Sequence, residues 1–345
     1  MTRARVARRV AMAAAYGGGG LGLLSAGALG LVRVEAWFAR RTIGETTGTP
    51  PRSDGVYGEH HDGPLLTVAM LGDSSAGGLG VASPHQTPGG MLAAGLAECA
   101  DRPVRLICPA VVGAQSSDLG RQVALVAPHR PQLTLVMIGA NDVTHRVRPG
   151  TAVRHLEDAV RALRELGSEV VVGTCPDLGT VEPVAQPLRW IARRASRELA
   201  AAQTIVVVEA GGRTVSLGDI LGPEFASSPR EMFGPDRFHP SAAGYASAAA
   251  ALLPSACAAL GLWFGEAPED SRPDARRGEG VRPVAVAAAQ AVEQAGTEVA
   301  GAELAGREGG PRGRWALLRR RPIRRPPPAG DTGATQDVET RAAEP

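Results

Sequence analysis

Short apolar runs rich in β-branched residues alternate with helical stretches between Leu65 and about Leu262. The apolar runs are predicted to be strands, and they lie at 65–71, 104–112, 133–138, 169–174 and 204–209. The helical stretches lie at about 88–100, 116–127, 151–166, 187–202 and 241–260. Short strands that are apolar throughout and separated by helices indicate a parallel sheet covered on both faces.

Right-handed crossovers between such strands place helices on both sides of the sheet. We therefore predict an α/β fold, a three-layer α/β/α sandwich with a central parallel sheet, for a domain covering residues 64–265. Ligands in folds of this kind bind at the carboxyl ends of the strands. The residues that directly follow each predicted strand are thus the first candidates for function.

The chain before this domain has a different composition. Residues 1–41 contain a basic N-terminal segment and then an uncharged run, Val10 to Val32, which is long enough to cross a bilayer as a helix. We expect a signal anchor, or a signal peptide cleaved near Ala28, so that the domain leaves the cytoplasm. A buried helix in a cytosolic protein is the remaining alternative. Residues 42–63 are rich in Gly, Pro and Thr and are predicted to be a linker.

The chain after the domain, residues 266–345, is dominated by Pro, Gly, Glu and Arg and is predicted to be disordered. Its arginine cluster at 319–325 either contacts anionic lipid or cell-wall polymer or only keeps the tail soluble. The formal net charge of the whole chain is +2, which gives no electrostatic reason to expect a nucleic-acid partner.

The cysteines do not define a metal site or a disulfide scaffold. No pair of them forms a CxxC motif, and none has a Cys/His metal spacing. In an exported domain of this length one or two disulfides are possible, and buried free thiols are the alternative. The four residues are Cys99, Cys108, Cys175 and Cys257.

Two segments carry residue types suited to nucleophilic catalysis. Gly72-Asp73-Ser74 follows the first predicted strand, which places the Ser74 hydroxyl at the ligand-binding edge of the sheet. In the segment 236–240, Asp236 and His239 are three residues apart, so that the carboxylate can lie beside the imidazole and fix its tautomer. Pro240 is expected to open the helix that follows. Either segment alone is also compatible with ordinary turn or capping chemistry.

Two further segments offer hydrogen-bond donors at strand ends. Asn141 lies in Gly139-Ala140-Asn141-Asp142, directly after the strand 133–138, and its side-chain amide is suited to a developing oxyanion. Gly113 follows the strand 104–112 and presents a backbone amide without a side chain. An Asn or a Gly in a loop is usually only turn chemistry, so neither segment is informative alone.

Together, and in this order along the chain, the four segments resemble the SGNH/GDSL hydrolase family. The family's named residues are Ser, Gly, Asn and His, which match Ser74, Gly113, Asn141 and His239. The downstream pair Gly244-Tyr245 also fits the last family block. One departure is Cys108, where family members often have Asn, and it affects only the expected loop geometry.

The resemblance implies a flavodoxin-like SGNH hydrolase fold and hydrolysis of carboxylic esters, with lipid acyl, lysophospholipid and acetyl esters as candidate substrates. It makes Ser74 the nucleophile, His239 the general base and Asp236 the residue that orients His239. The amides of Ser74 and Gly113 and the side chain of Asn141 would form the oxyanion hole. No metal or organic cofactor is expected, and the expected partners are the ester substrate and a membrane bound through the N-terminal helix.

The same residues leave two alternatives open: an acyltransferase that uses the same triad, and a non-catalytic binding module on the same fold. The substrate pocket is expected to be shaped by the loops 75–90, 142–150, 176–186 and 211–235.

The remaining histidines offer little chemistry by pattern. His60, His61 and Asp62 in the linker are compatible with a metal site, but a solvated linker is the favoured interpretation. His145 follows the Asn141 segment and is a candidate to line the pocket. No partner pattern accompanies the three others, His85, His129 and His155.

Overall fold

The computed structural model of the protein describes residues 48–262 without a break, together with residues 30, 31, 33–35, 38, 298 and 299. Almost all of the uncharged run at 10–32 and of the tail at 266–345 lies outside these residues, so the expectations for both segments remain predictions. So do the domain boundaries that depend on them.

A seven-stranded sheet runs through the described residues in the order β1-β3-β2-β4-β5-β6-β7. Strands β2 to β7 pair in parallel, and β1 pairs with β3 in the antiparallel sense. The strands are β1 (Gly55–Tyr57), β2 (Leu66–Gly72), β3 (Val104–Ile107), β4 (Leu133–Met137), β5 (Glu169–Gly173), β6 (Arg213–Val215) and β7 (Glu298–Val299).

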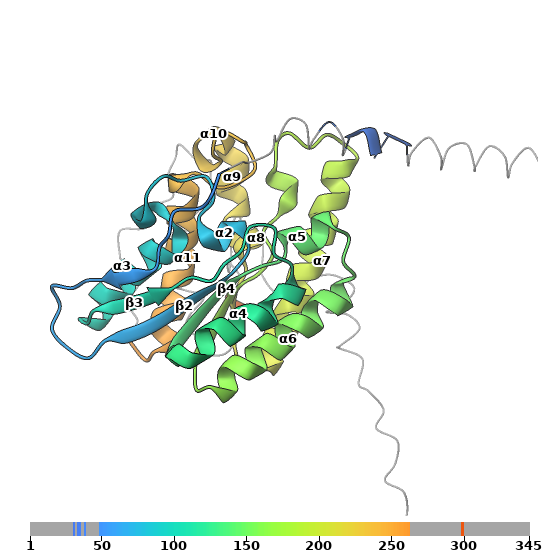
Figure 1. Ribbon diagram of the computed structural model, residues 1–345. Coiled ribbons are helices and arrows are strands. Elements are labelled where there is room, and N and C mark those ends of the chain that lie inside the picture. Colours follow the sequence, from blue (N-terminus) through green and yellow to red (C-terminus); the bar gives the residue numbers. More distant parts are fainter. Residues whose placement is uncertain (1–29, 32, 36–37, 39–47, 263–297, 300–345) are drawn as a thin grey trace, which may run out of the picture.

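Helices connect the strands and cover both faces of the sheet (Figure 1). The α-helices are α2 (Ser74–Gly77), α3 (Pro88–Ala100), α4 (Leu119–Val126), α5 (Ala140–Thr144), α6 (Pro149–Glu165), α7 (Leu188–Glu209), α8 (Leu217–Ile220), α9 (Gly222–Ser227), α10 (Pro229–Met232) and α11 (Ala242–Ala259). Short 3-10 helices are η1 (Pro84–Gln86), η2 (Ser116–Asp118), η3 (Ala127–His129) and η4 (Leu178–Thr180).

Successive side chains of β2 point to opposite faces of the sheet and belong to two separate apolar layers. Val68 and Met70 belong to the layer that α3 and α11 cover, whereas Ala69 and Leu71 belong to the layer covered by α4, α6 and α7. Successive strand residues point to opposite faces of a sheet, so a strand that is apolar throughout is buried on both sides. The predicted three-layer α/β/α sandwich is confirmed.

One predicted strand is wrong. The run 204–209 forms the last turns of α7, and the strand that follows is β6, at Arg213–Val215. Val206 and Val207 are buried against the helical layer, and burial of this kind outweighs the β preference of branched residues. The helix ends at Glu209, and the left-handed φ of 81° at Gly211, two residues further on, lets the chain turn back into the sheet.

Two other predictions need adjustment at the edge of the sheet. The strand predicted at 104–112 ends at Ile107, because Pro109 lacks the N–H that a strand within a sheet donates. Residues 55–57 of the predicted linker form β1, and Tyr57 is buried there with its hydroxyl donating to the Ser53 carbonyl oxygen at 2.8 Å. The sheet is therefore mixed, not wholly parallel.

Helix α11 is long and apolar enough to cross a membrane. It is the one helix of the described residues with that property, and more than half of it is buried inside the domain. Tyr245, Leu252 and Cys257 on α11 are fully buried, and the helix packs in the same apolar layer as α3. These contacts identify α11 as a core helix.

Candidate active site

The chain turns sharply between β2 and α2, and this turn presents Ser74. Gly72 has a φ of 141°, and a Cβ placed on it would lie 1.9 Å from the Met137 carbonyl oxygen, so only glycine fits there. Asp73 caps α2 by accepting a hydrogen bond from the Ser75 amide at 2.8 Å. Strand β2 lies between β3 and β4, where the strand order changes direction. Ser74 thus lies at the topological switch point of the sheet, where ligands bind in open α/β folds.

The structure brings Ser74, His239 and Asp236 together although 165 residues of sequence separate the first two. The Ser74 Oγ lies 3.0 Å from His239 Nε2, and His239 Nδ1 lies 2.7 Å from Asp236 Oδ2. Ser74 and His239 are both buried. A hydroxyl, an imidazole and a carboxylate are therefore hydrogen-bonded in series.

Hydrogen bonds within the loop that carries His239 hold this loop in place. The second carboxylate oxygen of Asp236 accepts hydrogen bonds from the backbone amides of Phe238 and His239, both at 3.0 Å. Phe233 and Pro240 form an antiparallel bridge across the loop. The side chain of Ser241, not Pro240, caps the following helix α11, by accepting from the Gly244 amide at 3.1 Å. Asp236 thereby fixes both the backbone and the ring of His239.

Helix α5 holds the loop that contains Gly113. The Asn141 Nδ2 donates to the Ala114 carbonyl oxygen at 3.0 Å, which leaves the second N–H of this amide for another acceptor. The neighbouring Asp142 is buried and accepts from the Ser116 hydroxyl at 2.8 Å. Gly113 itself is exposed, with a left-handed φ of 81°. The two predicted donors, Gly113 and Asn141, therefore belong to segments in direct contact.

Two buried glutamines support the strand ends, and sequence reasoning did not single them out. The Gln122 side chain accepts from the Gly72 amide at 2.7 Å and donates to the Gly72 carbonyl oxygen at 2.8 Å. The Gln203 side chain accepts from the Cys175 amide at 2.7 Å and donates to the Ile138 carbonyl oxygen at 3.0 Å. The only signal in the sequence is a polar residue on an otherwise apolar helix face.

Three more side chains, those of Asp73, Tyr245 and Cys108, lie in or beside the turn that presents Ser74. Burial raises the pKa of Asp73 to about 7, and the nearby Asp142 carboxylate adds to this effect, whereas the hydrogen bond from Ser75 opposes it. The buried Tyr245 hydroxyl donates to the Leu79 carbonyl oxygen at 2.7 Å, which ties α11 to the end of the turn. Cys108, the departure from the family pattern, has its Sγ 3.9 Å from the Ala76 carbonyl oxygen on α2.

An apolar cavity of about 80 Å³ opens beside this turn. Its lining comes from the ends of β2, β4 and β5 and from the segment between β6 and α11, including Ser75, Leu178, Val181, Leu217, Phe225, Phe233 and Phe238. The loops predicted at 176–186 and 211–235 thus contribute to it. The loop 142–150 contributes no lining residue, and the exposed His145 instead places its Nδ1 2.9 Å from the Asn141 carbonyl oxygen.

The fold and this site define a class of protein. The profile of the GDSL-like lipase/acylhydrolase family matches residues 70–247, which contain Ser74, Gly113, Asn141 and His239. The chain belongs to that family and is an ester hydrolase.

Among individual proteins, the chain is similar to the GDSL-like esterase Rv1075c of Mycobacterium tuberculosis, strain ATCC 25618 / H37Rv. The two are 41% identical over 252 residues, which cover 70% of this chain and 80% of that protein. Among solved structures, TesA is 23% identical, with a TM-score of 0.44 and coverage of 57% of this chain and 100% of that one. The acetylxylan esterase Axe2 of Geobacillus stearothermophilus is 18% identical, with a TM-score of 0.41 and coverage of 52% and 89%.

Proposed function

We propose that this protein hydrolyses carboxylic esters by a serine mechanism in which Ser74 is the nucleophile. The observation that carries the proposal is the series of hydrogen bonds from Ser74 Oγ to His239 Nε2, at 3.0 Å, and from His239 Nδ1 to Asp236, at 2.7 Å. A base within hydrogen-bond reach of a hydroxyl, itself oriented by a third group, is the arrangement that activates a serine.

The chemistry follows from these contacts. Ser74 Oγ attacks the ester carbonyl carbon while His239 Nε2 takes its proton, and the Asp236 carboxylate stabilises the imidazolium that forms. The carbonyl oxygen becomes an oxyanion, and the amides of Ser74 and Gly113 and the free N–H of Asn141 are the donors proposed to hold it. His239 then protonates the leaving alcohol, and water, activated by the same imidazole, releases the acid from Ser74.

The apolar cavity is lined by Asp73 and Ser75, the two neighbours of Ser74 in the chain, and is the candidate site for an apolar acyl group. Phe225, Phe233 and Phe238 supply aromatic walls, and Leu178 and Val181 supply aliphatic ones. Burial of each methylene of an acyl chain in such a site stabilises the complex by about 0.8 kcal/mol. Within the candidate substrates, this lining favours lipid acyl and lysophospholipid esters over acetyl esters.

We also propose that the N-terminal segment directs the domain out of the cytoplasm and tethers it to a membrane. Support comes from residues 30–38, where Leu31, Val34 and Phe38 are exposed. Glu35 lies against the start of α7 and accepts a hydrogen bond from the Leu188 amide at 3.0 Å. Trp190 and Ile191, near the start of α7, are exposed as well, so both the end of the predicted anchor and the helix that Glu35 contacts carry exposed apolar side chains.

Kinetics of four variants test the catalytic proposal. Ser74→Ala and His239→Ala should each lower kcat by on the order of 10⁴-fold or more on p-nitrophenyl esters, with an unchanged fold by circular dichroism. Ser117→Ala and His129→Ala, both at exposed positions, are matched controls and should keep full activity. A Ser74→Ala protein that retains most of its activity would refute the mechanism.

A substrate panel tests the acyl preference separately. With p-nitrophenyl esters of increasing chain length, kcat/KM should rise beyond acetate and then fall once the chain exceeds the cavity. A preference for acetate, or for acetylated glycans over alkyl esters, would refute the preference for apolar acyl groups while leaving the triad in place.

A further inference from the structure

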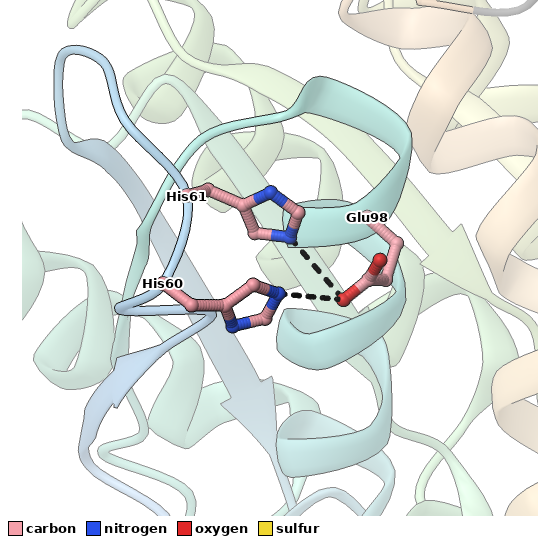
Figure 2. Close-up of side chains that lie close together, drawn as sticks. All are labelled: His60, His61 and Glu98. Carbon is pink, nitrogen blue, oxygen red and sulfur yellow. Dashed lines mark hydrogen bonds and ion pairs between the residues drawn. The ribbon is translucent and has the colours of Figure 1, made fainter.

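Two histidines and a glutamate gather between the loop that follows β1 and helix α3 (Figure 2). His60 Nε2 lies 3.6 Å and His61 Nε2 lies 3.2 Å from the same oxygen of Glu98, Oε1. One ligand atom from each of the three residues lies within 4.8 Å of the other two. None of these residues belongs to the hydrogen-bonded series of Ser74, His239 and Asp236.

The spacing of these atoms suits a small divalent metal ion. Zinc binds imidazole nitrogen and carboxylate oxygen at roughly 2.0–2.2 Å, so tetrahedral ligand atoms lie about 3.3–3.5 Å apart. The two separations from Glu98 Oε1, 3.2 and 3.6 Å, bracket that value. Two imidazoles with a single carboxylate favour Zn²⁺ over Mg²⁺ or Ca²⁺, which prefer oxygen ligands.

His61 is also oriented as a metal-binding histidine usually is. Its second ring nitrogen, Nδ1, lies 2.8 Å from Asp101 Oδ1, so this carboxylate can hold the tautomer whose Nε2 lone pair points toward Glu98. The His61 side chain is only 11% exposed, so its ring has little freedom to turn away. Asp101 is the C-cap of α3, with a left-handed φ of 50°, and its carboxylate reaches His61 from the end of the helix.

A glycine allows the loop after β1 to lie close to helix α3. Gly58 has a φ of 67°, and a Cβ there would lie 2.5 Å from the Ala97 Cβ and 2.9 Å from the His61 ring. Glycine therefore permits the close contact that brings both imidazoles to Glu98. A hollow beside the cluster is lined by His60, Glu98, Tyr57, Glu59 and His85, which leaves space for water as a further ligand.

We propose that His60, His61 and Glu98 bind one zinc ion, with water completing the coordination, and that Asp101 positions His61. The ion joins the β1 loop to α3 and so stabilises the antiparallel edge of the sheet. The proposal is independent of the ester hydrolase mechanism, because no group of the site around Ser74 takes part in it.

The test is calorimetric titration of the untagged, metal-stripped full chain with ZnCl₂, combined with thermal unfolding. We expect one equivalent to bind, and the melting temperature to rise by roughly 5–10 °C at a free Zn²⁺ concentration about 100-fold above Kd. His61→Ala and Glu98→Gln should each weaken binding at least about 10-fold. Asp101→Asn, which leaves all three ligands in place, should weaken binding on the order of 10-fold or more.

Two matched controls separate this site from other histidines. His129→Ala removes an exposed histidine elsewhere, and His239→Ala removes the histidine beside Ser74; both should leave zinc binding and the thermal shift unchanged. The metal-free variants should melt close to the metal-free parent protein, which shows that they fold. Absence of saturable binding, or binding that His61→Ala and Glu98→Gln leave intact, would overturn the proposal.

Discussion

Burial strongly affects the ionisation of Asp73. It lies between Gly72 and Ser74, is almost fully buried, and has a pKa raised from its ordinary value of 3.8 to about 7 by burial. Between these two values the native state holds a proton that the unfolded chain releases. The unfolded state then binds fewer protons, so stability contributed by this group falls as pH rises through the window.

Asp73→Asn should remove this pH dependence. The variant keeps a side-chain oxygen to cap α2 and has no charge to bury. The difference in free energy of unfolding between the variant and the parent protein should therefore shift in favour of the variant as the pH rises from 4 to 7. The expected increase is on the order of 1–4 kcal/mol, with the upper value set by the full pKa shift. Urea unfolding at several pH values measures it. Asp62→Asn, at an exposed position, should show no such trend, and equal pH slopes for Asp73→Asn and the parent would contradict the assignment.

Substitutions of Asn141 test the proposed oxyanion hole. Its remaining N–H acts on charge that exists only in the transition state, so Asn141→Ala should lower kcat on the order of 10²–10³-fold with KM little changed. Asn141→Asp should be worse, because a carboxylate repels the oxyanion. Asp142→Asn should cost less, since it keeps an acceptor for Ser116. Steady-state kinetics on one ester decide the matter: a raised KM with normal kcat would make Asn141 a ground-state binding residue.

At the scale of elements, helices position the strand ends through buried amides. Helix α4 reaches β2 through Gln122, and α7 reaches β4 and the end of β5 through Gln203. Each side-chain amide offers a donor and an acceptor to backbone groups at the end of a strand or just beyond it. The turn that presents Ser74 is therefore fixed from the helical layer as well as from the sheet.

Gln122→Ala should destabilise the protein by about 1–3 kcal/mol, because the buried Gly72 amide loses its hydrogen-bond partner. It should also lower kcat, since Ser74 follows Gly72 by two residues. Urea unfolding and steady-state kinetics measure the two effects. Gln86→Ala, at an exposed position, is the matched control and should change stability by no more than about 0.5 kcal/mol. Equal stability of the two variants would show that the amide contributes little.

The sequence predicted most elements because apolar periodicity reports burial. Strands β2, β4 and β5 and helices α3, α6 and α11 lie close to the predicted ranges. The run 204–209 was wrongly predicted to be a strand because β-branched residues also occur on a helix face that is buried by tertiary contacts. Strand β1 was missed because three residues carry no periodicity, and its antiparallel pairing depends on β3, far along the chain.

The residues of the candidate site were predictable where a short local motif contains them. Ser74, Asp236 and His239 were identified from local segments, and their mutual distances required the fold. The roles of Gln122 and Gln203 depend on contacts across 50 and 65 residues of sequence, which no local pattern encodes. The proposed zinc site likewise pairs a loop with a helix residue, Glu98, that gives no signal of its own in the sequence.

At the scale of the whole molecule, Glu35, three residues beyond the predicted anchor, contacts the start of α7 by accepting a hydrogen bond from the Leu188 amide. If the N-terminal segment tethers the protein, the full chain should sediment with membranes or be cleaved near Ala28, while a chain that begins at Thr42 should be soluble and keep its esterase activity. Cell fractionation with an activity assay measures both. Intact full-length protein in the cytosol would contradict the anchor.

Labelling with a serine-reactive phosphonate, followed by intact-protein and peptide mass spectrometry, tests the role of Ser74 most directly. With Ser74 as the nucleophile, we expect one phosphonate per chain, on Ser74, and a labelling rate that falls at least about 10²-fold in His239→Ala. Loss of esterase activity should follow the same time course as labelling. Label on another serine, or activity that survives complete labelling of Ser74, would contradict the assignment of Ser74 as the nucleophile.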